Sequence, residues 1–471
     1  MTSSRSISIS ILVLLGSGLF LRLLLAYVIL PDSHVSGDVL MYTDWGQALA
    51  IEGPSGFYAK LDTVDYPPGY LYVLWAVGEI SRMVAPGSPV EALGVAASLM
   101  RIPPIAFDVC AGFLLYLIVR RWAGSSPNAE HTALIAAAIY LFNPVTWYDS
   151  AIWGQTDSVG ACLILISVIA LTQWSSEAAA AIATLAALVK PQFGVVLIPL
   201  VGAVLLRRHL YFGSNLASDA LFGRTYWLRN DGPVRLISSF VTAIIVFYVV
   251  LAPFDLDARS FIQRMTKTAT FYNYLSVNAF SAWALIGSGN TPAIIFATPE
   301  TFGEKISWSH DDIPILGIFT GADIGSFLLV LGFGLGVARL IWSADRWSIV
   351  LVGAYFSMCF FMLPTRVHER YLIPTFAFAS LLAALDRKWL WATITLAVAS
   401  FINIHGIFTM IDLVAKSRIH LPLSAFFRTQ AGILLSIVLH TAVFCFAIWC
   451  LRPKLMQSEM HRQDVAVGMD R

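Results

Sequence analysis

Near the N-terminus, the sequence reads ISILVLLGSGLFLRLLLAYVIL over residues 9–30 and then SGDVLMYTDW over residues 36–45. A helix needs roughly 20 apolar residues to cross a bilayer, so the first stretch predicts a membrane span. It is too long for a signal peptide, carries Arg22 and lacks a small-residue cleavage site, so we expect it to be retained. The second stretch places Asp38 and Asp44 where this span meets water, and ionisable residues at such positions are candidates for function.

The same apolar character extends over the whole chain of 471 residues. Hydrophobic residues make up 58% of it and charged residues 13%, which is about half the charged fraction of an ordinary soluble domain. We therefore predict an all-α polytopic membrane protein. The net charge is only +1 and the basic residues are scattered through short loops, which argues against a nucleic-acid partner. The five cysteines lie in hydrophobic runs, which favours small core residues over disulfides or metal ligands.

Apolar runs recur along the chain, and we expect about twelve spans, within a range of about 11 to 13. They cover residues 9–30, 92–119, 131–147, 156–173, 177–190, 191–206, 235–253, 316–341, 347–363, 371–385, 389–410 and 430–451. A further stretch, 68–84, contains Glu79 and Arg82, and its short apolar core predicts an interfacial helix lying on the membrane. The expected bundle occupies residues 1–453, and the tail 454–471 is predicted to be cytoplasmic and disordered.

Basic residues between the spans predict the orientation of the bundle. If 68–84 does not cross the membrane, the basic pairs fall on the cytoplasmic side, as the positive-inside rule requires. These pairs include Arg120-Arg121, Arg207-Arg208 and Arg387-Lys388. Two long loops, 31–91 and 254–315, then face outward, and loops of this length usually have a function.

The sharpest acidic candidates are the two carboxylates after the first span. We favour Asp38 as a catalytic base, although a solvated loop carboxylate or a helix cap is the alternative. That alternative is stronger for Asp44, which we assign as a supporting acid. The two residues are six positions apart, so they do not form an Asp-x-Asp metal-binding pair.

Cationic candidates lie in two later segments. Lys190 interrupts an apolar stretch just before the helix-breaking Pro191, so we predict a functional charge, with a lysine snorkelling at a helix end as the alternative. Arg366, His368 and Arg370 alternate along one predicted outer turn. Arginine presents paired donors to phosphate oxygens, so we expect this turn and Lys190 to bind a phosphate, and contact with lipid headgroups is the alternative for the turn.

Six further residues are expected to line the same site. Gln155 and Asp157 could instead cap the helix that follows them, Tyr66 could belong to an interfacial aromatic belt, and Asn278 could serve ordinary loop packing. The full set is Tyr66, Gln155, Asp157, Gln192, Asn278 and Glu369.

Several of these residues belong to short motifs in a recognisable order. An Asp at the end of the first span with Trp45 seven positions later is followed by Asp65-Tyr66-Pro67-Pro68-Gly69, Arg101 with Asp108, Trp153-Gly154-Gln155-Thr156-Asp157, Leu188-Val189-Lys190-Pro191-Gln192 and His368-Glu369-Arg370-Tyr371. Over about residues 10–385 the chain resembles the GT-C superfamily of integral-membrane glycosyltransferases. It is most similar to bacterial relatives of the GPI-anchor mannosyltransferases and of the dolichyl-phosphate-glucose-dependent glucosyltransferases of N-glycan assembly.

The resemblance implies an inverting hexosyltransferase in the bacterial inner (plasma) membrane, with its site facing outward. Its donor would be a polyprenyl-phosphate-linked sugar, with mannose favoured over glucose, and its acceptor a lipid-linked or polymeric glycan. Asp38 matches the family's general base, and His368, Glu369 and Arg370 match its His-Glu-Lys turn, with arginine replacing lysine. Many superfamily members contain an Asp-x-Asp motif, which is missing here. The sequence therefore gives no support for a divalent metal as a cofactor, although one is possible.

Two other classes of protein remain open from the sequence. A secondary transporter or lipid flippase would also use a broken helix like the one at Lys190-Pro191. Against it, the halves show no internal repeat and the polar clusters gather at one face. A non-catalytic partner in a cell-envelope assembly would not need these converging charges.

Overall fold

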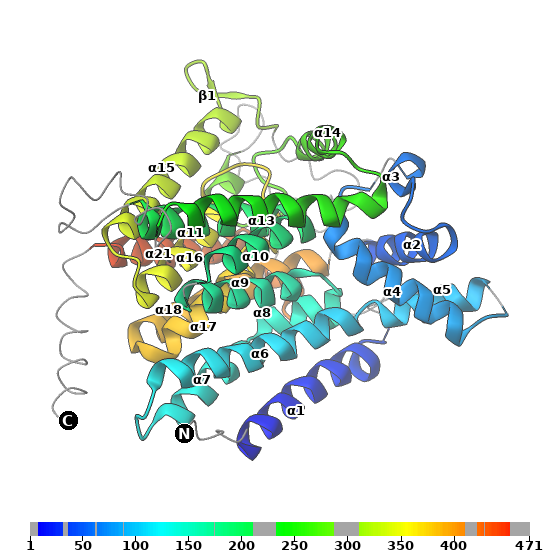
Figure 1. Ribbon diagram of the computed structural model, residues 1–471, viewed down its shortest axis with the longest axis horizontal. Helices are drawn as coiled ribbons and strands as arrows, with labels where there is room; N and C mark the ends of the chain where they lie inside the picture. Colours follow the sequence, from blue (N-terminus) through cyan, green and yellow to red (C-terminus); the bar gives the residue numbers. More distant parts are fainter. Residues whose placement is uncertain are drawn as a thin grey trace.

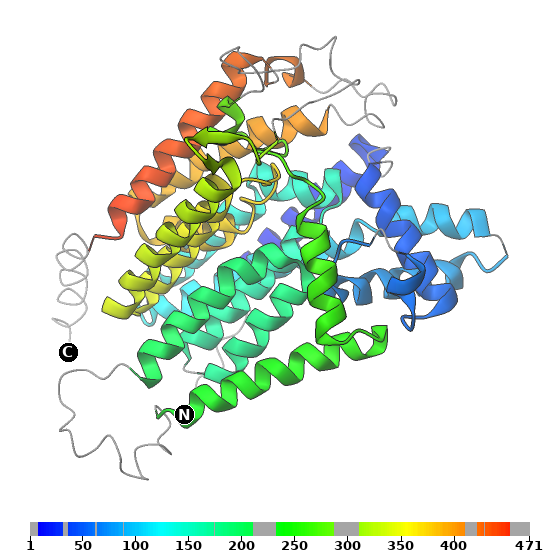
Figure 2. The ribbon, with the colours of Figure 1, turned by 90° about the horizontal axis from the view of Figure 1, so that it is seen from above.

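The computed structural model describes residues 8–31, 36–61, 64–87, 89–173, 175–210, 232–286, 310–409, 422–427 and 429–452. It is a bundle of long helices, as Figures 1 and 2 show. The longer helices are α1 Ile9–Leu24, α2 Gly37–Glu52, α4 Pro68–Val84, α5 Pro89–Leu99, α6 Ile102–Ala123, α7 Ala129–Leu141, α9 Asp157–Thr172, α10 Ser176–Val189, α11 Pro191–His209, α13 Val234–Leu251, α14 Ala258–Ala269, α15 Gly321–Trp342, α16 Arg346–Met362, α17 Thr375–Leu385, α18 Arg387–Phe408 and α21 Gln430–Cys450.

Short elements join these helices. They are the π-helices η1 Leu25–Ile29 and η3 Tyr148–Trp153, the helical turns α3 Phe57–Lys60, α8 Pro144–Trp147, η5 Ala252–Phe254, η6 Ala282–Leu285 and α20 Ser424–Phe427, and a small hairpin of β1 Pro314–Leu316 and β2 Phe319–Thr320. The fold is therefore an all-α membrane bundle, as predicted.

Apolar helices account for each of the twelve expected spans. In the described part of the chain, seven helical stretches, some of them made of two consecutive elements, are long and apolar enough to cross a membrane: Ile9–Ile29, Glu91–Ala123, Pro191–His209, Val234–Phe254, Gly321–Trp342, Arg387–Phe408 and Gln430–Cys450. Five shorter apolar helices of 10–17 residues occupy the other expected ranges, and these are α7, α9, α10, α16 and α17. A bundle can accommodate such short helices where neighbouring helices, rather than lipid, surround them.

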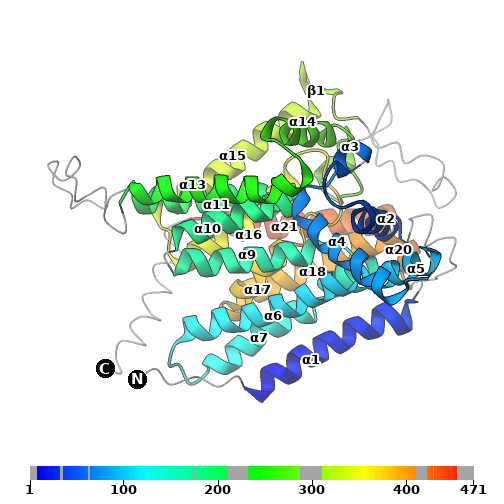
Figure 3. The same ribbon diagram turned by 45° about the vertical axis from the view of Figure 1, so that its right-hand side comes forward.

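The stretch predicted as the first long loop is in fact mostly helical. It contains α2, α3 and α4, and α4 coincides with the helix predicted over 68–84. The helices α2 and α4 pack almost backbone to backbone, since a Cβ at Gly46 would lie 2.7 Å from the Leu74 carbonyl oxygen. Figure 3 shows these helices together with α5 at one end of the bundle.

The span expected over 92–119 is interrupted. Helix α5 ends at Leu99 and α6 begins at Ile102, because Pro103 and Pro104 lack the N–H group that an interior helical position needs and are tolerated only in a first turn. Arg101 is buried at the break and its guanidinium donates to the Pro31 carbonyl oxygen at 3.2 Å. Helix α5 then packs on α2 and α4 instead of extending α6 along the bundle.

Two further boundaries and the contents of one loop differ from the prediction. Helix α7 ends at Leu141 rather than 147, because the Asn143 side chain accepts the Val145 N–H at 2.9 Å and starts α8. Helix α15 begins at Gly321 rather than 316, after the hairpin. The expected loop 254–315 contains α14 and η6, and the predicted disordered tail 454–471 lies outside the described residues.

A buried arginine fastens α1 to the rest of the bundle. The Arg22 Nε atom lies 2.9 Å from Asp108 of α6, and both side chains are almost wholly buried. The same carboxylate accepts the Tyr140 hydroxyl at 2.8 Å, and Arg22 also donates to the Leu141 carbonyl oxygen at 2.9 Å. These contacts secure the end of α7, from which α8 and η3 continue toward the polar site.

Candidate functional site

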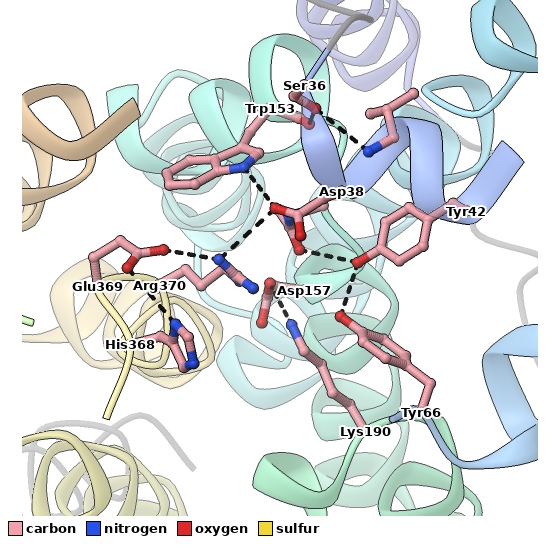
Figure 4. A network of polar contacts seen from close by, with 12 residues as sticks. Ser36, Asp38, Tyr42, Tyr66, Trp153, Asp157, Lys190, His368, Glu369 and Arg370 are labelled. Carbon is pink, nitrogen blue, oxygen red and sulfur yellow. Dashed lines mark hydrogen bonds and ion pairs between the residues drawn. The ribbon is translucent and has the colours of Figure 1, made fainter. Parts of the chain in front are cut away.

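The first part of the site is the N-terminal turn of α2. The Ser36 hydroxyl caps this helix by accepting the Val39 N–H at 3.4 Å, so Asp38 itself is not the cap. Asp38 lies in the first turn, where the helix dipole favours a negative charge. Its Oδ2 atom accepts hydrogen bonds from Trp153 Nε1 at 2.9 Å and from Gln155 Nε2 at 2.6 Å (Figure 4).

The two donors to Asp38 come from the last residue of η3 and from the turn that follows it. Gly154 reverses the chain there with a φ of +76°, which glycine adopts without strain. A Cβ at Gly154 would lie 2.6 Å from Val39 Cγ2, so α2 rests directly on this turn. The backbone turn therefore sets the distance between Asp38 and its donors.

A chain of hydrogen bonds continues from Gln155 toward α4. The Tyr42 hydroxyl donates to Gln155 Oε1 at 3.2 Å and lies 2.8 Å from the Tyr66 hydroxyl. Burial is the main cause that raises the pKa of Tyr66 above its ordinary range. Both phenols thus stay protonated and link the predicted lining residues Gln155 and Tyr66 to the helix of Asp38.

Arg370 brings the distant turn before α17 to the same point. Its Nη1 atom lies 3.9 Å from Asp38 Oδ2 and 2.8 Å from Glu369 Oε1. Burial alone would lower the pKa of Arg370, but the carboxylates of Asp38 and Glu369 outweigh it and hold the pKa well above its usual value. Arg370 is therefore a permanent cation between an acid from α2 and an acid from its own turn (Figure 4).

The neighbours of Arg370 carry shifted pKa values as well. Burial raises the pKa of Glu369, whose Oε2 atom is buried without a hydrogen-bond partner among the described residues. Burial, helped by the charges of Arg370 and Lys190, lowers the pKa of His368 well below its ordinary value. The imidazole of His368, packed at 5.0 Å against the Tyr272 ring, is thus held neutral.

Lys190 lies at the break between α10 and α11. Its backbone is extended and Pro191 starts the next helix, which leaves the side chain buried at the junction. The Lys190 Nζ atom lies 3.1 Å from Asp157 Oδ2, and Gln192 Nε2 donates to Asp157 Oδ1 at 2.8 Å. Asp157 is thus neutralised by Lys190 rather than acting as a helix cap.

The Pro-Pro-Gly motif brings α4 to this lysine. A Cβ at Gly69 would lie 2.5 Å from the Leu188 carbonyl oxygen, so the start of α4 touches the end of α10 directly. As a result, the Tyr66 ring lies 5.7 Å from Lys190 Nζ, within the range of a cation–π contact. The sequence motif is therefore what places Tyr66 between Lys190 and Tyr42.

Three predicted residues have other surroundings. Asp44 is exposed on α2, about 120° around the helix from Asp38. Arg366 binds Asp311 through Nε at 2.6 Å and Nη2 at 3.1 Å. Asn278 contributes its backbone, since its carbonyl oxygen accepts from Asn403 Nδ2 at 2.8 Å and it pairs with His368 in a β-bridge.

Other residues of the site were not among the predicted ones. Tyr42 and Trp153 contact the predicted residues directly. Asp65 has one buried oxygen atom without a hydrogen-bond partner in the described part of the chain, and burial raises its pKa, while the charges of Arg370 and Lys190 lower it. All three lie inside the motifs of residues 36–45, 65–69 and 153–157. Their place in these motifs is the signal in the sequence that points to the site.

The site is rich in acids, but their spacing does not suit a metal ion. Across the described ranges, no group of three or more His, Cys, Asp and Glu side chains is arranged to hold one. The cationic groups next to the acids are instead Arg370 and Lys190. The arrangement can accept a proton at Asp38 and stabilise an anion beside Arg370.

Comparison with known proteins adds one match. A family model described as the ALG6, ALG8 glycosyltransferase family matches residues 58–444, which is more than half of the 471 residues. The matched range includes Tyr66, Gln155, Lys190 and Arg370 and begins after Asp38. A search of curated proteins finds no match.

Proposed function

Because the chain belongs to the ALG6, ALG8 glycosyltransferase family, we propose that it transfers a hexose from a polyprenyl-phosphate donor to an acceptor hydroxyl with Asp38 as the base. Membership makes the chain a membrane glycosyltransferase with a lipid-linked donor and a glycan acceptor. It also favours an enzyme over a transporter or flippase. The residue roles, the sugar and the side of the membrane are the proposal.

In the proposed step, the acceptor oxygen attacks the anomeric carbon while the bond from that carbon to the donor phosphate breaks. The acceptor proton passes to the Asp38 carboxylate, and the leaving polyprenyl phosphate keeps the bonding electrons. A single displacement of this kind inverts the anomeric configuration. General-base catalysis by a positioned carboxylate contributes about 10²–10⁴-fold to such a rate.

One observation carries the assignment of Asp38. Trp153, Gln155 and Arg370 all approach the Oδ2 atom, at 2.9, 2.6 and 3.9 Å. No described side chain donates to the Oδ1 atom, and about a quarter of the side chain is exposed. The carboxylate is therefore oriented by one oxygen while the other can accept a proton from a substrate.

Arg370 is the proposed cation for the leaving phosphate. Its Nε atom is buried without a hydrogen-bond partner among the described residues, so it has a donor to offer an anionic ligand. Preorganised cations of this kind stabilise charge that develops in the transition state. Lys190, paired with Asp157 at 3.1 Å, supplies a second positive charge beside Tyr66.

The donor sugar is assigned less directly. The sequence favoured mannose, whereas the matched family is named for glucosyltransferases, so we propose glucose as the donor sugar and mannose as the competitor to test. The outward-facing site is supported by the direction of α11. This helix has Gln192 at the end near the site and Arg207 and Arg208 at the other end, and basic residues favour the cytoplasmic side.

The test is sugar transfer by the purified chain in lipid nanodiscs. Radiolabelled polyprenyl-phosphate-glucose and polyprenyl-phosphate-mannose are compared with membrane lipid extract as the acceptor. We expect Asp38→Asn to lower transfer by about 10²-fold or more, while Asp44→Asn, on the exposed face of the same helix, changes it by less than about twofold. Transfer that persists in Asp38→Asn would remove Asp38 from its role as base.

A further inference from the structure

The turn that carries His368, Glu369 and Arg370 lies between α16 and α17 and has no helix of its own. For the proposed reaction, the side chains of His368 and Arg370 must nevertheless be held to within about 0.5 Å of their working positions. The contacts that hold it come from the second long external segment.

The strongest of these contacts is the pair of Arg366 and Asp311. The guanidinium binds the carboxylate in a fork, with Nε at 2.6 Å from Oδ2 and Nη2 at 3.1 Å from Oδ1. Asp311 is completely buried, and Oδ2 also accepts the Thr365 hydroxyl at 2.8 Å. The remaining Nη1 group of Arg366 donates to the Ala269 carbonyl oxygen at 2.9 Å.

Backbone hydrogen bonds extend this pair toward the site. The Arg366 N–H donates to the Tyr274 carbonyl oxygen at 2.9 Å, and the Val277 N–H donates to the Val367 carbonyl oxygen at 2.9 Å. His368 then forms β-bridges with Val277 and Asn278. Only Glu369 lies between this bridge and Arg370, whose Nη1 atom lies 3.9 Å from Asp38 Oδ2.

The backbone of the turn is strained at the same place. Arg366 has a φ of +64°, a region that residues with a side chain rarely adopt, and Asn278, which pairs with the turn and belongs to a residue type that tolerates this region better, has a φ of +65°. Such conformations persist only where surrounding contacts hold them, and they often occur at functional sites. For Arg366, those contacts are its own bonds to Asp311, Ala269 and Tyr274.

We infer that Arg366 and Asp311 form a clasp that positions the turn of His368 and Arg370, and that Arg366 is a positioning residue rather than a ligand of the donor phosphate. All three nitrogen groups of the guanidinium already bind protein oxygens. A phosphate could take the paired Nε and Nη2 donors only by displacing a wholly buried carboxylate. The inference rests on the proposed function for its link to catalysis, but the clasp itself is testable without it.

The experiment uses the full chain in nanodiscs and two readouts. Asp311→Asn removes the charge, Arg366→Lys keeps the positive charge but removes the fork, and Asp312→Asn is the matched control at the neighbouring exposed acid. Hydrogen exchange is followed at residues 273–279 and 365–371. Kinetics are measured with polyprenyl-phosphate-glucose, or with the mannose donor if that is the substrate.

A clasp predicts faster exchange in both segments for Asp311→Asn and Arg366→Lys, with kcat lowered at least about tenfold and donor KM changed by less than about threefold. Asp312→Asn should behave like the unmodified chain. Donor KM raised about tenfold or more in Arg366→Lys alone, with exchange unchanged, would make Arg366 a phosphate ligand and overturn the inference.

The exchange readout also separates the two proposals. If the chain transferred neither sugar, the proposed function would fail, while exchange would still report whether the clasp holds the turn. If Asp311→Asn did not fold, Arg366→Lys and Thr365→Ala would supply the comparison, since each removes only some of the bonds to Asp311. Unchanged exchange in both of these variants would contradict the clasp.

Discussion

Asp38 and Asp44 share one helix, but their surroundings differ completely. Asp38 meets donors from the end of η3 and the turn after it and a cation from the turn before α17, whereas the side chain of Asp44 is exposed. A carboxylate becomes chemically useful when fixed donors hold one oxygen and leave the other accessible. Position on the helix, rather than residue type, therefore distinguishes the two acids.

The buried pair of Lys190 and Asp157 leads to a prediction about stability. Lys190→Met leaves the Asp157 carboxylate buried and uncompensated, so we expect the free energy of unfolding to fall by about 3–5 kcal/mol. Thermal unfolding in detergent measures this loss. Adding Asp157→Asn removes the orphan charge and should recover most of it. If Lys190→Met kept the stability but weakened donor binding, the lysine would serve the ligand instead.

His368 leads to a prediction about pH. Its folded pKa lies below that of the unfolded chain, because burial and the charges of Arg370 and Lys190 oppose its protonation. Below about pH 6.5, the unfolded chain therefore binds a proton that the folded chain resists, and stability falls by up to about 1.4 kcal/mol per pH unit. Above that pH both states are neutral and the full stability is present.

The measurement is Tm between pH 7.5 and 5.5 for the unmodified chain and for His368→Gln. We expect the Tm of the unmodified chain to decline more steeply on acidification. Glu369 and Asp65, whose pKa values are raised by burial, oppose this trend but are present in both proteins. Identical slopes would show that His368 does not resist protonation.

Among the elements, the turn after η3 controls how α2 meets the bundle. Gly154 and Gly56 both have a left-handed backbone conformation, with φ of +76° and +70°, but of the two only Gly154 has a neighbour, Val39, in the space of a Cβ. Alanine at either position costs about 1–2 kcal/mol of backbone strain. At Gly154 a further cost of about 1–3 kcal/mol arises from overpacking.

We therefore expect Gly154→Ala to lower both Tm and sugar transfer, because α2 and Asp38 must move away from Trp153 and Gln155. Gly56→Ala should lower Tm only modestly and retain transfer. Equal losses of transfer in the two variants would mean that the contact with Val39 does not position Asp38.

The sequence predicted which stretches form helices better than where they break. Uninterrupted apolar runs show where a helix begins and ends. The run 430–451, for example, predicts both ends of α21 to within one residue. The break at Arg101 and the π-helix η3 depend on local prolines and on packing against α2, which hydropathy does not measure. The helix over 68–84 was found because its Pro-Pro start and its charged end both mark boundaries.

At the scale of the whole molecule, the sequence predicted that an acid after the first span would lie near a basic turn far downstream, and the structure brings Asp38 within 3.9 Å of Arg370. It did not predict which arginine would be there. Arg366 and Arg370 lie on the same turn, and the partner that separates them, Asp311, is 55 residues away from Arg366. A pair of residues so far apart in the chain produces no repeating pattern by which a single sequence could reveal it.

The orientation in the membrane is tested with single cysteines in a background without the five native ones. Thr270→Cys, beside α14, should react with an impermeant maleimide in intact cells. Ser125→Cys, between α6 and α7, should react only after permeabilisation. Both positions are exposed, so accessibility depends on the side of the membrane. The reverse pattern would refute the outward-facing site.

The crossing of α2 and α4 at Gly46 has a mechanical consequence. Eight residues of rigid helix, about 12 Å, separate Gly46 from Asp38, so α2 acts as a lever whose fulcrum is a contact between two backbones. A tilt of about 5° at the fulcrum would displace the Asp38 carboxylate by about 1 Å, and misplacement on that scale costs on the order of 100-fold in rate. With Asp38 as the proposed base, a single added methyl group at Gly46 or Gly78 is thus expected to lower sugar transfer from a distance, without touching either substrate.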